Sequence, residues 1–210
     1  MTVDERGRLI AVEGIDGSGK STQARLLADA LGAVRTHEPG ATALGRSVRA
    51  LVLEPDGGPV SARAEALLMA ADRAQHVAEV VAPALEEGRW VVTDRYCGST
   101  LAYQGYGQGL GLDELERLVH WASQGIDADL NVLVDVAPDV AGTRRSAVPD
   151  RLEKLDAGFH TRVREGYLAL AASDPGHWAV VDGSGSVAEV ADAVRAAVER
   201  QLGWPSKWRR

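Results

Sequence analysis

The sequence predicts an α/β fold in which five parallel strands form one sheet between two layers of helices. Two observations lead to this prediction. Short apolar runs alternate along the chain with longer segments whose apolar residues recur at helical spacing. In addition, a glycine-rich stretch at residues 14–22 separates the first apolar run from the first helical segment. This order places the N-terminus of a helix at the carboxyl end of a strand.

Five apolar runs are candidates for the buried strands. They are Leu9–Val12, a weaker run at Ala33–Thr36, Trp90–Val92, Asn131–Val136 and Trp178–Val181. Ligands of parallel sheets bind at the carboxyl ends of the strands. Polar residues that directly follow these runs are therefore candidates for functional residues.

The stretch after the first run reads GIDGSGKST and fits the pattern GxxxxGKS. Its glycines let backbone N–H groups turn toward a polyphosphate, and the helix that follows adds its dipole. Lys20 is predicted to reach the β and γ oxygens of a nucleoside triphosphate, and Ser21 to meet a Mg²⁺ ion. This pattern predicts a three-layer P-loop NTPase fold. The expected triphosphate-binding residues of the loop are Gly14, Ile15, Asp16, Gly17, Ser18, Gly19, Lys20, Ser21 and Thr22.

Glycine and proline divide the helical segments. Gly32 is a C-cap signal for the helix that follows the phosphate loop. The sequence EPDGGP at 54–59 predicts a turn between two helices. Pro83 lies inside the helical stretch 61–87, so we expect that stretch to kink or break there.

The third strand is followed by a charged pair, Asp94 and Arg95. An aspartate at the end of an apolar strand in a phosphate-loop protein is placed to meet Mg²⁺, usually through water. Arg95 can clamp a phosphate with two hydrogen bonds. A structural ion pair at the strand end is the alternative for both residues.

Composition limits the class of protein. The 210 residues are 45% hydrophobic, which is enough for one core and favours a single domain over residues 1–210. The formal charge of −7 argues against a nucleic-acid partner. The N-terminal sequence lacks the apolar stretch of a signal peptide, and no run approaches the length of a membrane span. With Cys97 as its single cysteine, the protein is expected in the cytoplasm, with this thiol packed rather than reactive.

Several motifs occur in order at spacings that resemble thymidylate kinases, the enzymes that transfer the γ-phosphoryl group of ATP to dTMP. They are GIDGSGKST, HEPG, RAEALLMAADRAQH, DRYCGSTLAYQG and PDRLEKLDAGF. The resemblance extends from about residue 8 to residue 200. It implies Mg²⁺ as cofactor, ATP and dTMP as substrates, a role in dTTP biosynthesis and a homodimer. The segments 61–87 and 112–126 are candidates for the contact faces of that dimer.

The resemblance also implies an acceptor site. Asp16 is expected to bond the 3′-hydroxyl of dTMP, and Arg49 and Arg95 its phosphate. Arg73 is expected to donate to the thymine O4, whereas Tyr103 would crowd C2′ and disfavour ribonucleotides. The full predicted set is Asp16, Glu38, Pro39, Arg49, Met69, Arg73, Arg95, Ser99, Thr100, Tyr103 and Gln104. Taken singly, Arg49 and Arg73 also fit charges on a helix surface, and Tyr103 a core aromatic residue.

Three positions depart from the family's common pattern. Met69 stands where phenylalanine commonly stacks on thymine, and both stacking through its sulfur and packing in the core remain open. His37 stands where arginine is frequent and is expected to make no equivalent phosphate contact. Gly17 stands where some relatives carry an arginine that stabilises the transferring phosphoryl group.

Because Gly17 has no side chain, that positive charge is expected from a lid at about residues 142–155. The resemblance implies that Arg144 lies along adenine and that Arg145 or Arg151 reaches the phosphoryl group, Arg151 being favoured by the DRLE match. The predicted catalytic residues are thus Lys20, Arg95, Arg145 and Arg151, and the predicted metal ligands are Ser21 and Asp94. Arg162 and Arg164 are expected on a solvated helix face.

Two other functions compete with phosphorylation of dTMP. A deoxynucleoside kinase needs a carboxylate base beside the attacking hydroxyl and fewer phosphate-binding arginines, so Arg49 and Arg95 argue against it. A nucleotide-dependent switch protein would hydrolyse ATP slowly and would need no pyrimidine pocket. ATP together with a panel of nucleosides and monophosphates separates the three functions.

Overall fold

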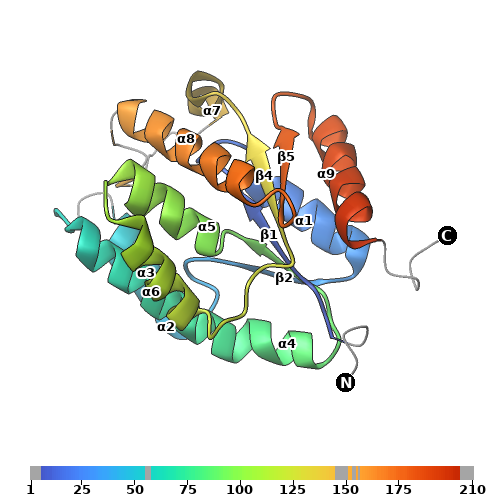
Figure 1. Ribbon diagram of the computed structural model, residues 1–210, viewed down its shortest axis with the longest axis horizontal. Coiled ribbons are helices and arrows are strands. Elements are labelled where there is room, and N and C mark those ends of the chain that lie inside the picture. Colours follow the sequence, from blue (N-terminus) through green and yellow to red (C-terminus); the bar gives the residue numbers. More distant parts are fainter. Residues whose placement is uncertain (1–5, 55–57, 145–150, 153–154, 156, 204–210) are drawn as a thin grey trace.

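The computed structural model describes residues 6–54, 58–144, 151–152, 155 and 157–203. Its centre is a five-stranded sheet with the order β2-β3-β1-β4-β5, in which every neighbouring pair is parallel (Figure 1). The strands are β1 (Leu9–Glu13), β2 (Val34–His37), β3 (Val91–Asp94), β4 (Leu130–Asp135) and β5 (Trp178–Asp182). The predicted α/β class and all five predicted strands are confirmed.

Helices cover both faces of this sheet. Helices α1 (Lys20–Leu31) and α9 (Val187–Leu202) come from opposite ends of the chain and pack side by side on one face (Figure 1). Their apolar sides join the central strands in one core cluster around Ile10, Leu27 and Val194. Helix α1 ends as predicted at Gly32, whose φ of 56° is left-handed.

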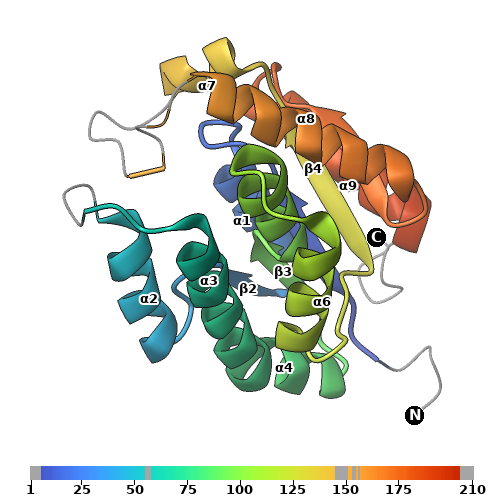
Figure 2. The same cartoon turned by 60° about the vertical axis from the view of Figure 1, so that its left-hand side comes forward.

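The other helices, apart from α7 (Pro138–Arg144), lie on the opposite face. They are α2 (Ala43–Leu53), α3 (Ala62–His76), α4 (Ala82–Glu86), α5 (Cys97–Thr100), α6 (Leu112–Ala122) and α8 (Ala157–Ser173). Helices α2, α3 and α6 pack together there, as Figure 2 shows. Two π-helical segments continue α3 and α5, namely η1 (Val77–Val81) and η2 (Leu101–Gly107). Two further core clusters lie on this face, one around Tyr103 and Phe159 and the other around Leu9 and Tyr96.

The break expected at Pro83 takes the form of η1. Pro83 has no N–H to donate within a helix, and it lies in the first turn of α4, where that donor is not needed. The five π-helical residues directly before α4 lead the chain into this turn. Of the turn predicted at 54–59, residues 55–57 lie outside the described part of the chain.

The strand ends bring the polar candidates to one edge of the sheet. His37 and Val12 both pair in register with Asp94, and Glu13 ends the central strand beside them. Helix α7 (Pro138–Arg144) follows β4, and its last three residues belong to the predicted lid at about 142–155. No helix within the described residues is both long enough and apolar enough to cross a membrane.

Candidate active site

The phosphate loop owes its shape to glycines in left-handed backbone conformations. Gly17 has a φ of 87° and Gly19, which precedes α1, a φ of 92°. A Cβ on Gly17 would lie 2.2 Å from the carbonyl oxygen of Ala141 in α7. Helix α7 thus closes over this point of the loop and leaves no room for the arginine that some relatives carry there.

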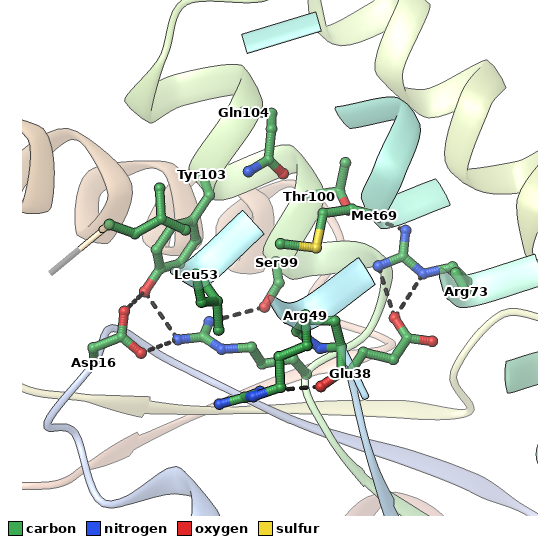
Figure 3. A pocket seen from close by; sticks show the side chains of 13 residues that line it. Asp16, Glu38, Arg49, Leu53, Met69, Arg73, Ser99, Thr100, Tyr103 and Gln104 are labelled. Carbon is green, nitrogen blue, oxygen red and sulfur yellow. Dashed lines mark hydrogen bonds and ion pairs between the residues drawn. The ribbon is translucent and has the colours of Figure 1, made fainter. Parts of the chain in front are cut away.

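One pocket brings together all the predicted acceptor-binding residues, and we call it the acceptor pocket (Figure 3). Its wall comes from the phosphate loop, the segments after β2 and β3, the elements α2, α3, α5 and η2, and Leu152. The lining residues are Asp16, Glu38, Pro39, Arg49, Leu53, Met69, Arg73, Arg95, Ser99, Thr100, Tyr103, Gln104 and Leu152. Of these, the sequence did not point to Leu53 and Leu152.

Asp16 is the point at which the phosphate loop meets the acceptor pocket. Lys20 Nζ donates to its Oδ1 from 3.2 Å, and the guanidinium of Arg95 donates to the same oxygen. The Tyr103 hydroxyl donates to Oδ2 from 2.8 Å. Burial raises the pKa of this carboxyl, but the charges of Arg95 and Lys20 outweigh burial and hold the pKa well below its usual range. Asp16 is therefore ionised and links the two predicted cationic groups.

A buried ion pair forms the opposite wall of the pocket. Arg73 Nε donates to Glu38 Oε2 from 2.9 Å, as Figure 3 shows, and Nη1 donates to the hydroxyl of Thr100 from 3.0 Å. Glu38 Oε1 lies 2.8 Å from His76 Nδ1, so this carboxylate has partners on both oxygens. The charge of Glu38 overcomes the effect of burial and raises the pKa of Arg73. Arg73 is thus a buried charge rather than a surface charge, and its protein partners alone fix its orientation.

Two further predicted residues extend into the pocket. Arg49 Nη1 donates to the carbonyl of Pro39 from 3.0 Å, which holds its side chain at the pocket edge. The half-buried Met69 points its thioether into the pocket (Figure 3) and belongs to none of the described core clusters. Tyr103, by contrast, has both roles, because its ring packs against Phe159 while its hydroxyl faces the pocket.

The chain resembles known proteins over nearly its whole length. The family model described as "Thymidylate kinase" matches residues 12–194. The chain belongs to the thymidylate kinase family. A thymidylate kinase of Cutibacterium acnes is 47% identical over 197 residues, covering 91% of this chain and 96% of that protein. One from a Synechococcus strain is 46% identical over 198 residues, with coverages of 92% and 96%.

The fold comparison agrees with the sequence comparison. The crystal structure of a thymidylate kinase from Ehrlichia chaffeensis superposes with a TM-score of 0.76 at 31% identity. It covers 92% of this chain and 99% of that structure. The chain is therefore a nucleoside monophosphate kinase with the P-loop NTPase fold that the sequence predicted.

A second groove borders the phosphate loop, and we call it the donor groove because several of the predicted ATP-binding residues line it. It is lined by Gly17–Gln23, by Arg144, and by residues between β5 and α9 and in the first turn of α9, namely Gly183, Gly185, Ser186, Val187 and Val190. Arg144, predicted to lie along adenine, donates to the carbonyls of Gly183 at 2.9 Å and Ser184 at 3.2 Å. The side chain of Ile15 lies in the core, so only its backbone can face a nucleotide.

The predicted metal ligands fit a Mg²⁺ ion. Asp94 Oδ1 is buried and has no hydrogen-bond partner among the described residues, as expected for an oxygen reserved for a cation. Ser21 is exposed in the first turn of α1 at the same edge of the sheet. The described residues hold no cluster of three or more His, Cys, Asp or Glu side chains that could hold a metal.

The structure does not bring Arg151 to the phosphate loop. Its guanidinium forms an ion pair with Glu65 of α3, and its Nε donates to the carbonyl of Val52 from 2.8 Å. The physical reason is that Glu65 is fully buried and needs a compensating charge, with Gln104 and Gln108 donating to its other oxygen from 2.7 Å each. In this arrangement Arg151 lies beside the acceptor pocket's wall, next to the lining residue Leu152 and bonded to the Glu65 that also holds Gln104. Arg145 lies outside the described residues.

Two other arginines were predicted on a solvated helix face; Arg162 is exposed as predicted, whereas Arg164 is half-buried, and both have partners on other elements. Arg164 makes two hydrogen bonds to the Asp135 carboxylate, at 2.7 and 2.8 Å, and Arg162 donates to the carbonyl of Gly107. Both therefore tie α8 to neighbouring elements. For Cys97, burial raises the pKa of the thiol to about 12, which agrees with the predicted packing role.

Sequence reasoning missed two residues behind the pocket, Glu13 and Tyr167. Both side chains are buried, and they bond to each other through the Tyr167 hydroxyl and Glu13 Oε2 at 3.0 Å. A carboxylate that ends an apolar strand was a visible signal for Glu13. Nothing local marked Tyr167, because its partners come from β1, β3 and α5.

Proposed function

We propose that this kinase transfers the γ-phosphoryl group of ATP, held in the donor groove, to dTMP held in the acceptor pocket. The reaction, ATP-dependent phosphorylation of dTMP to dTDP, follows from the family. The observation that carries the assignment of the two sites is the junction at Asp16, where Lys20 of the phosphate loop and Arg95 of the pocket donate to one carboxylate. The two substrates would thus meet across a single side chain.

The proposal assigns substrate contacts to several of the predicted residues. Arg95 and Arg49 bind the acceptor phosphate, Asp16 bonds the 3′-hydroxyl, and Lys20 contacts the β and γ oxygens of ATP. The Nη1 group of Arg73 has a second N–H besides the one given to Thr100, and this N–H can reach the thymine O4. Tyr103 fills the space beside C2′. The hydroxyl of Thr100 and the amide of Gln104 face the base.

No general base is required, because an ionised phosphate is already a nucleophile. Catalysis is then positioning and neutralisation of charge in an in-line transfer. Ser21 and Asp94 would hold Mg²⁺, which neutralises negative charge on the β and γ phosphates. An arginine of the lid segment 142–155, Arg145 or Arg151, would meet the transferring group. For Arg151 this requires leaving Glu65.

We further propose a single kinase domain over residues 1–210 that acts as a homodimer in the cytoplasm. Exposed apolar side chains support the dimer: Leu67 of α3 is 56% exposed and Trp121 of α6 is 79% exposed, on helices that pack together. Sedimentation of the parent and of a Trp121→Glu variant tests this assembly, and a monomeric parent would contradict it.

The test of the function is a substrate panel. With ATP as donor, we expect kcat/KM for dTMP to exceed that for UMP, CMP and AMP by at least about 10²-fold, because the pocket is built from polar contacts. Thymidine itself should not be phosphorylated. Equal turnover of dTMP and CMP would overturn the assignment of the pocket, and rapid phosphorylation of thymidine would favour a nucleoside kinase.

A further inference from the structure

Glu13 is a buried carboxylate directly behind the acceptor pocket. Its Oε1 accepts from the backbone N–H groups of Tyr96, at 2.9 Å, and Ser99, at 3.2 Å. Its Oε2 accepts from the hydroxyls of Ser99, at 2.6 Å, and Tyr167, at 3.0 Å. Two donors thus face each oxygen, and the side chain has no exposed surface. Burial raises the pKa of this carboxyl, and the hydrogen bond from Ser99 and the charge of Arg95 oppose that rise.

The same two hydroxyls also contact Arg95. Arg95 Nη1 donates to Ser99 Oγ from 3.0 Å and to the Tyr167 hydroxyl from 3.1 Å. Two hydroxyl bridges therefore connect the guanidinium to the Glu13 carboxylate. On its other side, Nη2 of Arg95 donates to Asp16 and to the Tyr103 hydroxyl, the latter at 3.0 Å. The guanidinium is held between two carboxylates, one in the pocket wall and one behind it.

The direction of the protons gives Glu13 its role. A hydroxyl has one proton to donate and lone pairs to accept with. At 2.6 Å, Ser99 Oγ gives its proton to Glu13, which leaves its lone pairs for Arg95. The Tyr167 hydroxyl lies 2.8 Å from Ser99 Oγ and close to Oε2, so its proton also turns away from Arg95.

We propose that Glu13 is a positioning residue for the reaction: it orients the Ser99 and Tyr167 hydroxyls so that both accept from Arg95, and so fixes the guanidinium that binds the acceptor phosphate. This inference rests on the proposed role of Arg95. The backbone of Arg95 strengthens the case, because its φ of 74° is left-handed and disfavoured for arginine. Glu13 offsets that cost by binding the N–H groups of Tyr96 and Ser99, which follow Arg95 in the chain.

The substitution Glu13→Gln tests this idea with little change of shape. Its amide oxygen can still accept from the two backbone N–H groups, which places the amide NH₂ where Oε2 was. Ser99 and Tyr167 then meet a donor in place of an acceptor, and their protons lose the partner that turned them from Arg95. We expect KM for dTMP to rise about tenfold or more, which is the size of effect seen when residues that orient metal-binding side chains are changed. KM for ATP should stay within about twofold.

Tyr167→Phe gives a second test if Glu13→Gln folds poorly. It removes one of the two bridges and should raise KM for dTMP by about 2–10-fold, as for one lost hydrogen bond. Tyr106→Phe is the matched control, because the Tyr106 hydroxyl makes no hydrogen bond with the described residues. Its kinetics should equal those of the parent. If each variant, Glu13→Gln or Tyr167→Phe, raises KM for ATP as much as KM for dTMP, the role of Glu13 is merely structural and the proposal is overturned.

A double-mutant cycle separates this inference from the proposed function. Arg95→Ala should itself raise KM for dTMP, and an unchanged KM there would refute the role of Arg95 whatever Glu13 does. If Glu13 acts through Arg95, Glu13→Gln should have little further effect on KM for dTMP in the Arg95→Ala background. If the Arg95→Ala enzyme is active and Glu13→Gln still raises its KM for dTMP by the same factor as in the parent, Glu13 does not act through Arg95.

Discussion

The acceptor pocket and the donor groove lie on either side of Asp16, but they are built in different ways. The groove presents main chain, with left-handed glycines at Gly17 and Gly19 and the N-terminus of α1. The pocket presents side chains that bond to one another, such as Arg73 with Glu38 and Arg95 with Asp16. A change to one pocket residue should therefore disturb its neighbours, whereas the groove depends on a short local segment.

The largest expected effect is on kcat, and it tests whether an arginine of the lid supplies the catalytic charge between the donor groove and the acceptor pocket. We expect Arg145→Ala or Arg151→Ala to lower kcat by about 10²–10⁴-fold with KM nearly unchanged, because an arginine that acts in the transition state does not affect ground-state binding. Steady-state kinetics of both variants, with circular dichroism to check folding, provides the measurement.

Glu65→Gln is the companion variant for Arg151, because it removes the ion pair that holds Arg151 at the pocket wall. If Arg151→Ala raises KM for dTMP and leaves kcat intact, Arg151 belongs to the pocket alone. If both lid variants keep kcat within about threefold of the parent, near 0.7 kcal/mol, the lid is not the source of the catalytic charge.

The interdependence of pocket residues predicts a large cost for Arg73→Ala. Removing this arginine leaves Glu38 buried with an uncompensated charge, so the free energy of unfolding should fall by about 3–5 kcal/mol. KM for dTMP should rise while ATP binding changes little. Denaturant unfolding and kinetics measure the two effects.

Arg63→Ala on the same helix is the control for Arg73→Ala. Its side chain is 76% exposed and lies 3.9 Å from Glu114, so its removal should cost at most about 1 kcal/mol. Loss of ATP affinity with dTMP affinity retained in Arg73→Ala would show that the pocket is assigned wrongly.

Asp72 of α3, which precedes Arg73 in the chain, predicts that the free energy of unfolding depends on pH. Burial and the nearby charge of Glu38 raise its pKa to about 6, and its Oδ2 is buried without a partner among the described residues. The folded state therefore binds this proton more tightly than the unfolded chain. The contribution of this proton to the free energy of unfolding is complete below about pH 4 and is lost as the pH rises toward 6. At pH 7, Asp72→Asn should thus be more stable than the parent by about 1–3 kcal/mol.

The advantage of Asp72→Asn should disappear near pH 4, where the parent is protonated as well. Unfolding curves across this pH range measure it, and Asp192→Asn, an exposed change on α9, should show no such trend. An advantage that is independent of pH would mean that the charge of Asp72 is not its cause.

The smallest expected effect concerns Met69, whose thioether points into the pocket. If it lies against thymine, Met69→Phe should tighten dTMP binding by about 0.5–1.5 kcal/mol, the range for aromatic pairs. Calorimetric titration with dTMP measures this gain. Loss of stability without a gain in affinity would indicate that Met69 packs in the core and does not contact thymine.

Much of the fold was predictable because its signals are local. Apolar runs and the glycine pattern located the strands and the phosphate loop, and Pro83 marked the place where the helical stretch changes type. The predicted acceptor residues share one pocket because they follow strand ends or lie on the helices beside them. Arg164 and Arg151 were harder, since nothing near them in sequence reveals their partners Asp135 and Glu65.

The sequence by itself determined the phosphate loop, since its glycines and its strand–loop–helix order act within about ten residues. The family motifs added the identity of the pocket residues. Only the tertiary structure decided how these residues are held. Glu13, Arg95 and Tyr167 come from β1, the end of β3 and α8, and they meet because the buried charges of Glu13 and Arg95 and the buried hydroxyl of Tyr167 all require partners.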